Sequence, residues 1–187
     1  MGTITNLTQR QVENIQIDEG VVYLNFQEEN ETLIAPTRGG GEFTATTTVR
    51  DIEFDGRNGK TDLQVIEEQG ATLKVTFLDM SQDKIALLIP NCAVEGTEDN
   101  AVLKNPKSGL IPSSSYLKNI TMFTKLLSGK YKRITIYNAM HETGFTAKAV
   151  QKAEGEFAAE FNAHYKTSDL DGKLWEISVV DTIQPGE

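Results

Sequence analysis

Hydrophobic and polar residues alternate strictly in one segment of the first half of the chain. From residue 42 to residue 49, apolar side chains or threonine occupy every second position, and polar side chains occupy the positions between them. Because successive side chains of a strand point to opposite faces, this spacing predicts a long β-strand with one half-buried face. The positions on that face are Phe43, Ala45, Thr47 and Val49.

The apolar phase shifts by one residue beyond these positions, which a β-bulge near Arg50–Asp51 would produce. The dipeptides Asp55-Gly56 and Asn58-Gly59 follow, and both accept the positive φ angles of tight turns. The strand is therefore expected to run from residue 42 to 54. It leads into a projecting hairpin or loop from residue 55 to 70, which is rich in charged residues.

The hydrophobic pattern changes period in the middle of the chain. Residues 71–77 alternate as in a strand, whereas the next apolar residues are spaced to lie on one face of a helix. Ser81 can cap this helix, and Pro90 ends it because a proline disfavours helical geometry in the residue before it. We predict a short helix at 81–89 that packs on a sheet through Ile85, Leu88 and Ile89.

The remaining segments predict a single domain over residues 1–187. Residues 1–20 are polar without a strong period and are expected to form an arm. Residues 91–116 hold Gly, Pro and Ser without a pattern and are expected to form a long loop. The predicted fold is mainly β, an antiparallel β-sandwich or barrel with one short flanking α-helix. Further strands are expected at 21–26, 119–127, 132–139, 156–165 and 174–180.

Composition narrows the class of protein without indicating an activity. A chain of 187 residues with 39% hydrophobic residues can bury a real core. The single cysteine, Cys92, excludes an internal disulfide and fits a reducing cytoplasm. The polar amino terminus and the lack of an apolar run of about 18 residues predict neither a signal sequence nor a membrane span.

Charge is distributed unevenly along the chain. Residues 1–100 hold 18 acidic and 7 basic side chains, a net of −11, whereas residues 101–187 hold 9 and 11, a net of +2. No acidic residue occurs between Asn100 and His141, a stretch with seven bases. This division is compatible with a solvated surface whose charges cluster by chance. It is equally compatible with a subunit that has one acidic and one basic face, suited to head-to-tail association.

No arrangement of residues indicates catalysis or a metal site. His141-Glu142 lacks the second histidine of a zinc-binding His-Glu-x-x-His helix, and His164 is far along the chain. The run Gly39–Gly41 precedes a strand rather than a helix, so a tight bend explains it better than a phosphate-binding loop. The net charge of −9 argues against nucleic-acid binding by the basic stretch. We therefore expect no enzymatic activity, cofactor or metal.

The order of several short sequence signatures resembles the tail tube, or major tail, proteins of long-tailed bacteriophages. The similarity extends over roughly residues 20–180 and depends on the order and spacing of the pieces. Those pieces are Thr37–Gly40, Arg50–Gly56, Ala71–Val75, Asn119–Thr121, Ile136–Ala139, Lys152–Phe157 and Phe161–Tyr165.

The resemblance implies a structural virion protein, made in the cytoplasm of a bacterial host and located in the tail. It implies a β-sandwich flanked by one helix, six copies of which form a ring, and rings that stack into a tube through which DNA leaves the capsid. The implied partners are other copies of the chain and the terminator, tape measure and distal tail proteins, with DNA passing through without specific binding. The candidate contacts between copies are Arg57, Lys60, Glu67, Glu68, Lys104 and Lys107.

Two alternatives remain open from the sequence. One is that the chain forms the inner tube of a tailocin or of a type VI-like contractile device, because such tubes are built from the same fold. A small-ligand-binding β-barrel is the other alternative, and it requires apolar residues around an internal cavity.

Overall fold

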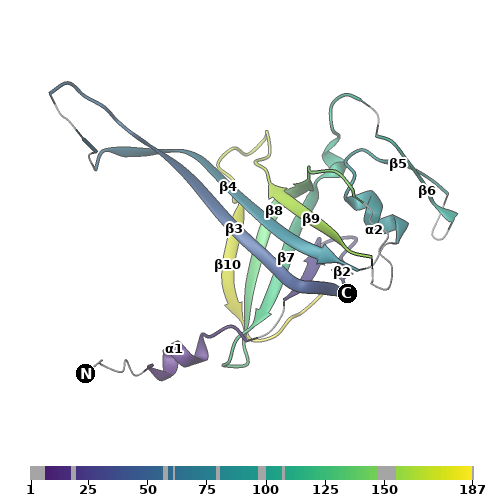
Figure 1. Ribbon diagram of the computed structural model, residues 1–187, viewed down its shortest axis with the longest axis horizontal. Helices are drawn as coiled ribbons and strands as arrows, with labels where there is room; N and C mark the ends of the chain where they lie inside the picture. Colours follow the sequence, from purple (N-terminus) through teal and green to yellow (C-terminus); the bar gives the residue numbers. More distant parts are fainter. Residues whose placement is uncertain are drawn as a thin grey trace.

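The computed structural model describes residues 7–17, 20–56, 59–60, 62–78, 81–96, 100–106, 108–146 and 155–186. The protein is mainly β, and eight strands form one antiparallel sheet in the order β2-β1-β7-β8-β9-β4-β3, with β10 paired to β8 (Figure 1). The eight strands are β1 (Val21–Leu24), β2 (Thr32–Ile34), β3 (Thr37–Asp51), β4 (Gln64–Phe77), β7 (Leu117–Lys125), β8 (Tyr131–His141), β9 (Phe157–Ala163) and β10 (Trp175–Val180).

The sheet divides at β8 because this strand changes its partner along its length. Its first half pairs with β10, as far as Ile136 opposite Trp175. Its last three residues pair with β9, beginning with Ala139 opposite Ala163. Asn138 lies between the two halves and has a left-handed φ of 48°. The sheet thus separates into two layers at this point.

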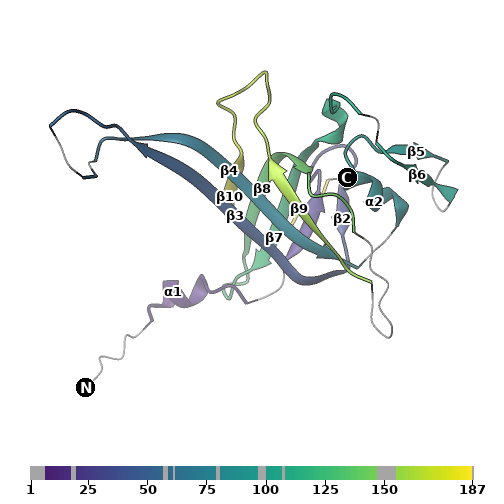
Figure 2. The same ribbon diagram turned by 45° about the horizontal axis from the view of Figure 1, so that its top comes forward.

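The layer of β3, β4 and β9 crosses over the layer of β1, β7 and β8, as Figures 1 and 2 show. The two layers approach closely at Gly41, where an added Cβ would lie 2.6 Å from the Sδ atom of Met122 in β7. Glycine at this position therefore permits the contact between layers. The arrangement confirms the predicted antiparallel β-sandwich.

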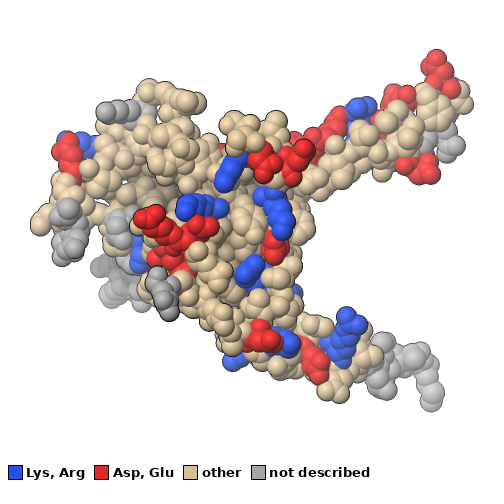
Figure 3. Space-filling model, turned by 180° about the vertical axis from the view of Figure 1, so that it is seen from behind, with Lys and Arg blue, Asp and Glu red and all other residues tan. Residues whose placement is uncertain are grey.

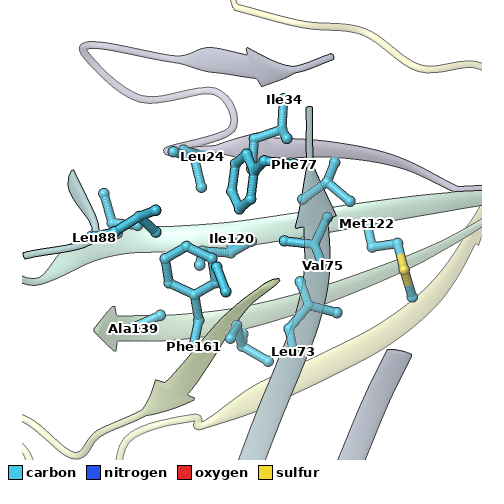
Figure 4. Close-up of a cluster of buried hydrophobic side chains, with 14 of the residues drawn as sticks. Leu24, Ile34, Leu73, Val75, Phe77, Leu88, Ile120, Met122, Ala139 and Phe161 are labelled. Atoms are coloured by element: carbon cyan, nitrogen blue, oxygen red, sulfur yellow. The ribbon is translucent and has the colours of Figure 1, made fainter. Parts of the chain in front are cut away.

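The core between the layers includes the side chains that alternation assigned to the interior, and also Ile34, which lies in a segment where no strand was predicted (Figure 4). The four apolar residues of 71–77 are all buried, and the ring of Phe77 stacks on that of Phe157 with centroids 4.8 Å apart. Burial of large apolar side chains is the main favourable term in folding. The side chains that Figure 4 labels are Leu24, Ile34, Leu73, Val75, Phe77, Leu88, Ile120, Met122, Ala139 and Phe161.

The predicted helix at 81–89 is confirmed as α2 (Gln82–Leu87). Ser81 is at the N-cap position, but its side chain makes no capping hydrogen bond. Leu88 is buried in the core, whereas Ile85 and Ile89 are only half-buried. A second helix, α1 (Gln9–Glu13), lies in the segment expected to be an arm, where Thr8 and Gln11 form a capping box. Alpha1 has no buried residue, so it produces no apolar period in the sequence.

The strand predicted over residues 42–54 begins earlier and ends sooner than its pattern indicated. Beta3 starts at Thr37, before the glycine run, and ends at Asp51. Gly39 and Gly40 have positive φ angles of 72° and 70°, and here the pairing with β4 jumps from Thr37–Phe77 to Gly41–Val75. The glycines are thus required for a bend inside the strand.

The bulge expected near Arg50–Asp51 lies instead in β4. Thr48 pairs with Glu68 and Val49 with Ile66, so Glu67 is the additional residue. Residues 64–70, which the sequence placed in a hairpin or loop, are part of β4 and pair with β3. Asn58, which was expected in the turn, lies outside the described residues.

The segment 91–116 also contains regular structure that the sequence did not indicate. Beta5 (Ala93–Glu95) and β6 (Val102–Lys104) form a separate two-stranded sheet, and a 3₁₀ helix, η2 (Ser113–Ser115), follows. Strands of three residues are too short for alternation to be recognised, which explains the difference.

Candidate subunit interface

The outer part of the β3–β4 hairpin extends away from the body of the protein (Figures 1 and 2). We call residues 45–56, 59–60 and 62–70 the outer hairpin. Every residue from Ala45 to Arg50 is exposed, because no second layer covers either face there. The sequence expectation of one half-buried face is therefore correct only as far as Phe43. A two-stranded ribbon without a covered face is marginally stable alone.

Apolar side chains are exposed along this ribbon. Val49 and Ile66 are directly opposite each other, and they are 48% and 59% exposed. Phe54 and Leu63, farther along, are also about half exposed. An ion pair between Arg50 and Glu67 links the strands beside the bulge. Contiguous exposed apolar residues on a projecting element are typical of a docking surface.

Beta10 supplies a second exposed apolar surface. Trp175, Ile177 and Val179 are 40%, 46% and 53% exposed. The first two are paired with Ile136 and Ile134 of β8, which contribute to the core. Paired residues of antiparallel strands point to the same side, so the core face of the sheet continues onto β10 without a covering layer.

Beta10 is also an edge strand, since β8 is its one partner among the described strands. An edge with an apolar face is prone to pair with another chain. Ion pairs lie at both ends of the strand, Lys173 with Glu176 at 2.9 Å and Lys130 with Asp181 at 2.8 Å. The hydrogen bond from Lys173 lowers the pKa of the Glu176 carboxyl, and that from Lys130 to Asp181 raises the pKa of Lys130. The apolar row is thus bordered by charged groups.

The amino-terminal segment, residues 7–17, forms a second projection. Its attachment is through backbone hydrogen bonds to the turn after β7: the Leu127 N–H donates to the Ile15 oxygen at 2.9 Å, and the Ile17 N–H donates to the Lys125 oxygen at 3.1 Å. Leu7, Ile15 and Ile17 are exposed. Of the segment 1–20, which sequence analysis interpreted as an arm, the structure describes residues 7–17 and 20.

Beta10 connects the bases of the two projections. At its start, the ring of Trp175 contacts that of Phe43 at the base of the outer hairpin, with centroids 5.8 Å apart. At its end, Val180 pairs with Tyr131, next to the turn that holds the amino-terminal segment. Figure 3 shows a deep hollow between the two projections. We call the surface formed by the outer hairpin, β10 and residues 7–17 the concave face.

The concave face holds much of the exposed apolar surface. Of the 21 large hydrophobic side chains that are exposed among the described residues, 11 belong to these three elements. Single exposed hydrophobic residues are normal on protein surfaces, but such concentration in three elements indicates a binding surface.

The charged residues predicted as contacts fall at two ends of the molecule. Lys60, Glu67 and Glu68 lie on the outer hairpin, where acidic residues predominate (Figure 3). Lys104 lies on β6, at the far end of the long axis in Figure 1, where it pairs with Glu95 at 2.6 Å. Arg57 and Lys107 lie outside the described residues. The structure therefore does not bring the six together within one copy.

Two of the residues that sequence analysis weighed for chemistry, His141 and Cys92, contact backbone groups of the same chain. His141 is buried, and its Nδ1 accepts from the Glu160 N–H at 3.1 Å while its Nε2 lies 3.0 Å from the Gly144 oxygen. Cys92 is half-buried beside the Lys104 carbonyl. Within the described part of the chain, no three His, Cys, Asp or Glu side chains are grouped as a metal would require.

The apolar row of β10 is the part of the candidate interface that sequence analysis missed. Its alternation was visible, but alternation alone predicts burial and cannot reveal that the covering layer is absent.

Comparison with protein-family models finds no family that matches the chain, and comparison with curated proteins finds no match. Among the described residues, no helix has the length and hydropathy needed to cross a membrane.

Proposed function

We propose that this chain is a tail tube protein, a structural protein of the virion whose copies form rings that stack head to tail into a conduit for DNA. Its main partner is itself, and the ends of the tube contact other tail proteins. It has no catalytic role in this proposal.

The concave face is the observation that carries the proposal. A projecting hairpin, an uncovered edge strand and an extended amino-terminal segment all leave apolar groups in water, and the two projections border the hollow of Figure 3. These features are costly for a monomer and are explained if another chain covers them. A structural protein that functions as an assembly needs such surfaces, because its copies cover one another there.

Among the possible assemblies, the sequence favours a tail tube. The order of signatures resembles tail tube proteins over most of the chain, and the fold has the sandwich and flanking helix that this resemblance implies. The net charge of −9 also suits a DNA conduit, because acidic groups near the channel repel the DNA backbone and prevent adhesion.

The packing of the core argues against a small-ligand carrier. Such a barrel encloses a cavity within a closed sheet. Here Leu73, Ile120 and Phe161 are fully buried in the space between the layers. Within the described residues the sheet is also open, with β2, β3 and β10 each paired on one side.

Electron microscopy and sedimentation of the purified protein over a range of concentrations test the proposal. We expect rings or tubes with a central channel at high concentration. A protein that sediments as a 20.7 kDa monomer at every concentration and salt condition would overturn it.

A pair of variants makes this test specific. Ile177→Asp places a charge on the concave face and should abolish assembly. Leu170→Asp places the same charge on the exposed loop between β9 and β10 and should assemble like the wild type. Both positions are exposed, so both variants are expected to fold, which circular dichroism checks.

A further inference from the structure

The outer faces of the two layers differ in their chemistry. Each layer turns one face to the core, and alternation places the remaining side chains of its strands on the opposite face. In the layer of β3, β4 and β9, every second residue of 71–77 and of 157–161 is buried. The residues between them point away from the core. We call these outward residues and their neighbours on β3 the polar face: Glu42, Thr44, Thr72, Lys74, Thr76, Ala158, Glu160 and Asn162.

Hydroxyl, amide and charged groups make up the polar face. None of its eight side chains is aromatic, and the one apolar side chain is that of Ala158. Strand register aligns Thr44 with Thr72 and Thr72 with Asn162, and the Thr72 hydroxyl donates to the Asn162 Oδ1 at 2.8 Å. In Figure 1 this layer lies in front of β7 and β8, so the polar face is turned toward the viewer. It is thus a broad hydrophilic surface.

The basic groups of this surface are held by acidic ones. Lys74 is aligned between Glu42 and Glu160, and its Nζ lies 3.2 Å from the Glu160 carboxylate. At the edge of the face, Arg38 forms an ion pair with Glu156. The two bases thus face three acids. DNA is held by cations that contact its phosphates and by aromatic rings that stack on its bases. The polar face offers no ring and no excess of positive charge.

The outward face of the other layer has a different character. Tyr131, Arg133 and Tyr137 of β8 alternate with its core residues, and β7 ends with Lys125, which is aligned with Tyr131. Arg133 lies 3.5 Å from Glu176, whereas Lys125 has no ion pair within the described part of the chain. Basic side chains beside aromatic rings favour contact with nucleic acid. This second face is therefore unsuited to a channel that DNA must leave freely.

We propose that the polar face of β3, β4 and β9 lines the channel of the tube and is the surface past which DNA moves. This inference rests on the proposed function, because it names the side of each copy that faces the channel. Repeated around a ring, the polar face surrounds the DNA with hydroxyl groups and with paired charges that leave an acidic excess. That excess repels the phosphates, and the absence of rings leaves the bases nothing on which to stack.

Cysteine accessibility tests this inference. In a Cys92→Ser background, Thr44→Cys places a thiol on the polar face, where Thr44 is exposed. In tubes, a small fluorescent maleimide should modify this cysteine, whereas a maleimide linked to a large polymer should not, because the polymer cannot enter the channel. The same chain with Ile177→Asp stays unassembled and should react with both reagents. Lys125→Cys, on the second face, serves as the matched control and should not combine access for the small reagent with exclusion of the large one.

Three results of this measurement would overturn the inference. Modification of Thr44→Cys by the large reagent in tubes would place the polar face on the outside of the tube. Protection from both reagents in tubes alone would place it in a contact between copies. Access of only the small reagent to Lys125→Cys in tubes would place the second face in the channel instead.

Retention of DNA provides an independent measurement. Thr44→Lys together with Thr76→Lys adds two bases to the polar face of each copy. Tubes of this variant should retain at least about tenfold more short duplex DNA at low salt than wild-type tubes, because the added bases contact phosphates. The retained DNA should resist a nuclease too large to enter the channel. Equal retention by the two kinds of tube, or digestion of the retained DNA, would contradict the inference.

The outcomes separate this inference from the proposed function. Tubes whose Thr44→Cys reacts with the large reagent would leave the tube intact and refute only the assignment of the polar face. A wild type that never assembles contradicts the proposed function itself. Circular dichroism of each variant checks that the fold is retained.

Discussion

Asn119 illustrates how a single buried side chain extends the pairing of two strands. Its Nδ2 donates to the Phe26 oxygen at 3.0 Å, and its Oδ1 accepts from the Phe26 N–H at 2.8 Å. The amide group thus satisfies backbone groups just beyond the end of β1, where no neighbouring strand does so. Backbone polar groups without a partner are costly in a protein interior.

Replacing Asn119 by leucine should therefore destabilise the fold. The change keeps the size of the side chain but leaves buried backbone groups of Phe26 without partners, which costs about 1–3 kcal/mol per group. Chemical denaturation measures the loss. The exposed Asn105→Leu serves as a control and should be nearly neutral, so equal losses in the two variants would contradict the role of Asn119.

Glu142 is expected to make stability depend on pH. Burial raises the pKa of its carboxyl, but hydrogen bonds from His164 and Asn162 outweigh this effect and hold the pKa below the ordinary 4.5. A carboxyl with a lowered pKa in the folded state stabilises the folded protein at pH values above the pKa that this carboxyl has in the unfolded chain. This contribution is lost as the pH falls through the folded value.

Glu142→Gln should consequently lower stability at pH 6 relative to the wild type, and the difference should shrink as the pH falls below 4.5. Thermal unfolding of the two proteins across this range gives the comparison. A difference that stays the same from pH 6 to pH 3 would indicate that the hydrogen bonds do not depend on ionisation of Glu142.

Sequence analysis at the residue scale identified charged residues but not their partners. Lys104 and Glu67 were both proposed as contacts between copies, and the structure pairs them with Glu95 and Arg50 of the same chain. Both pairs depend on strand register, in a three-residue strand for one and beside a bulge for the other. Neither feature has a clear signature in the amino-acid pattern.

At the scale of elements, the period of the hydrophobic pattern predicted well which residues face the interior, but not how deeply each of them is buried. For α2, the spacing identified Ile85, Leu88 and Ile89 as one face, and the structure places Leu88 alone of these in the buried core. The helix covers the end of the sheet through its last turn. Periodicity indicates which face points inward, while depth depends on the tilt of the helix against its neighbours.

Leu88→Ala should cost about 2–5 kcal/mol, the usual range for leucine removed from a core. Ile85→Ala should cost less, since Ile85 is only half-buried. Guanidinium denaturation of both variants tests the order. An equal or larger loss for Ile85→Ala would place the core contact of α2 on its first turn instead.

The outer hairpin should respond to assembly more than any other described element. Its strands lack a covered face, so the amides of residues 45–50 are expected to exchange with solvent rapidly in the monomer. In the assembled protein they should exchange at least about tenfold more slowly, because a second copy covers them. Amides of β7 serve as an internal control and should be protected in both states. Slow exchange of the outer hairpin in the monomer would argue against its role in assembly.

At the scale of the whole molecule, the sequence predicted the fold class and an uneven distribution of charge, but not the shape. The alternation of residues 71–77 and 156–165 predicts strands wherever they lie, because side chains of both become buried. The concave face arises from the absence of a covering layer over β10 and the outer hairpin. An absent layer follows from how the sheet divides at Asn138, a long-range feature that no local pattern encodes.

The last prediction concerns salt and the direction of assembly. If the acidic outer hairpin meets the basic stretch of the next copy, salt should slow tube growth, because the screening length falls from about 10 Å at 0.1 M to about 3 Å at 1 M. Reversing Lys104 and Lys107 to Glu should slow growth at low salt and remove the effect of added salt. The fold should remain intact, since exposed charges contribute little to stability.

Light scattering at matched concentrations of wild type and reversed variant measures both effects. The double variant Lys74→Glu with Lys166→Glu changes the same number of charges outside both the basic stretch and the concave face, and should retain the salt dependence of the wild type. Tubes that grow equally fast from all three proteins at low and high salt would mean that apolar and backbone contacts determine growth. The tube would survive that result, and apolar contacts of the concave face would then have to set the polarity of the assembly without help from charge.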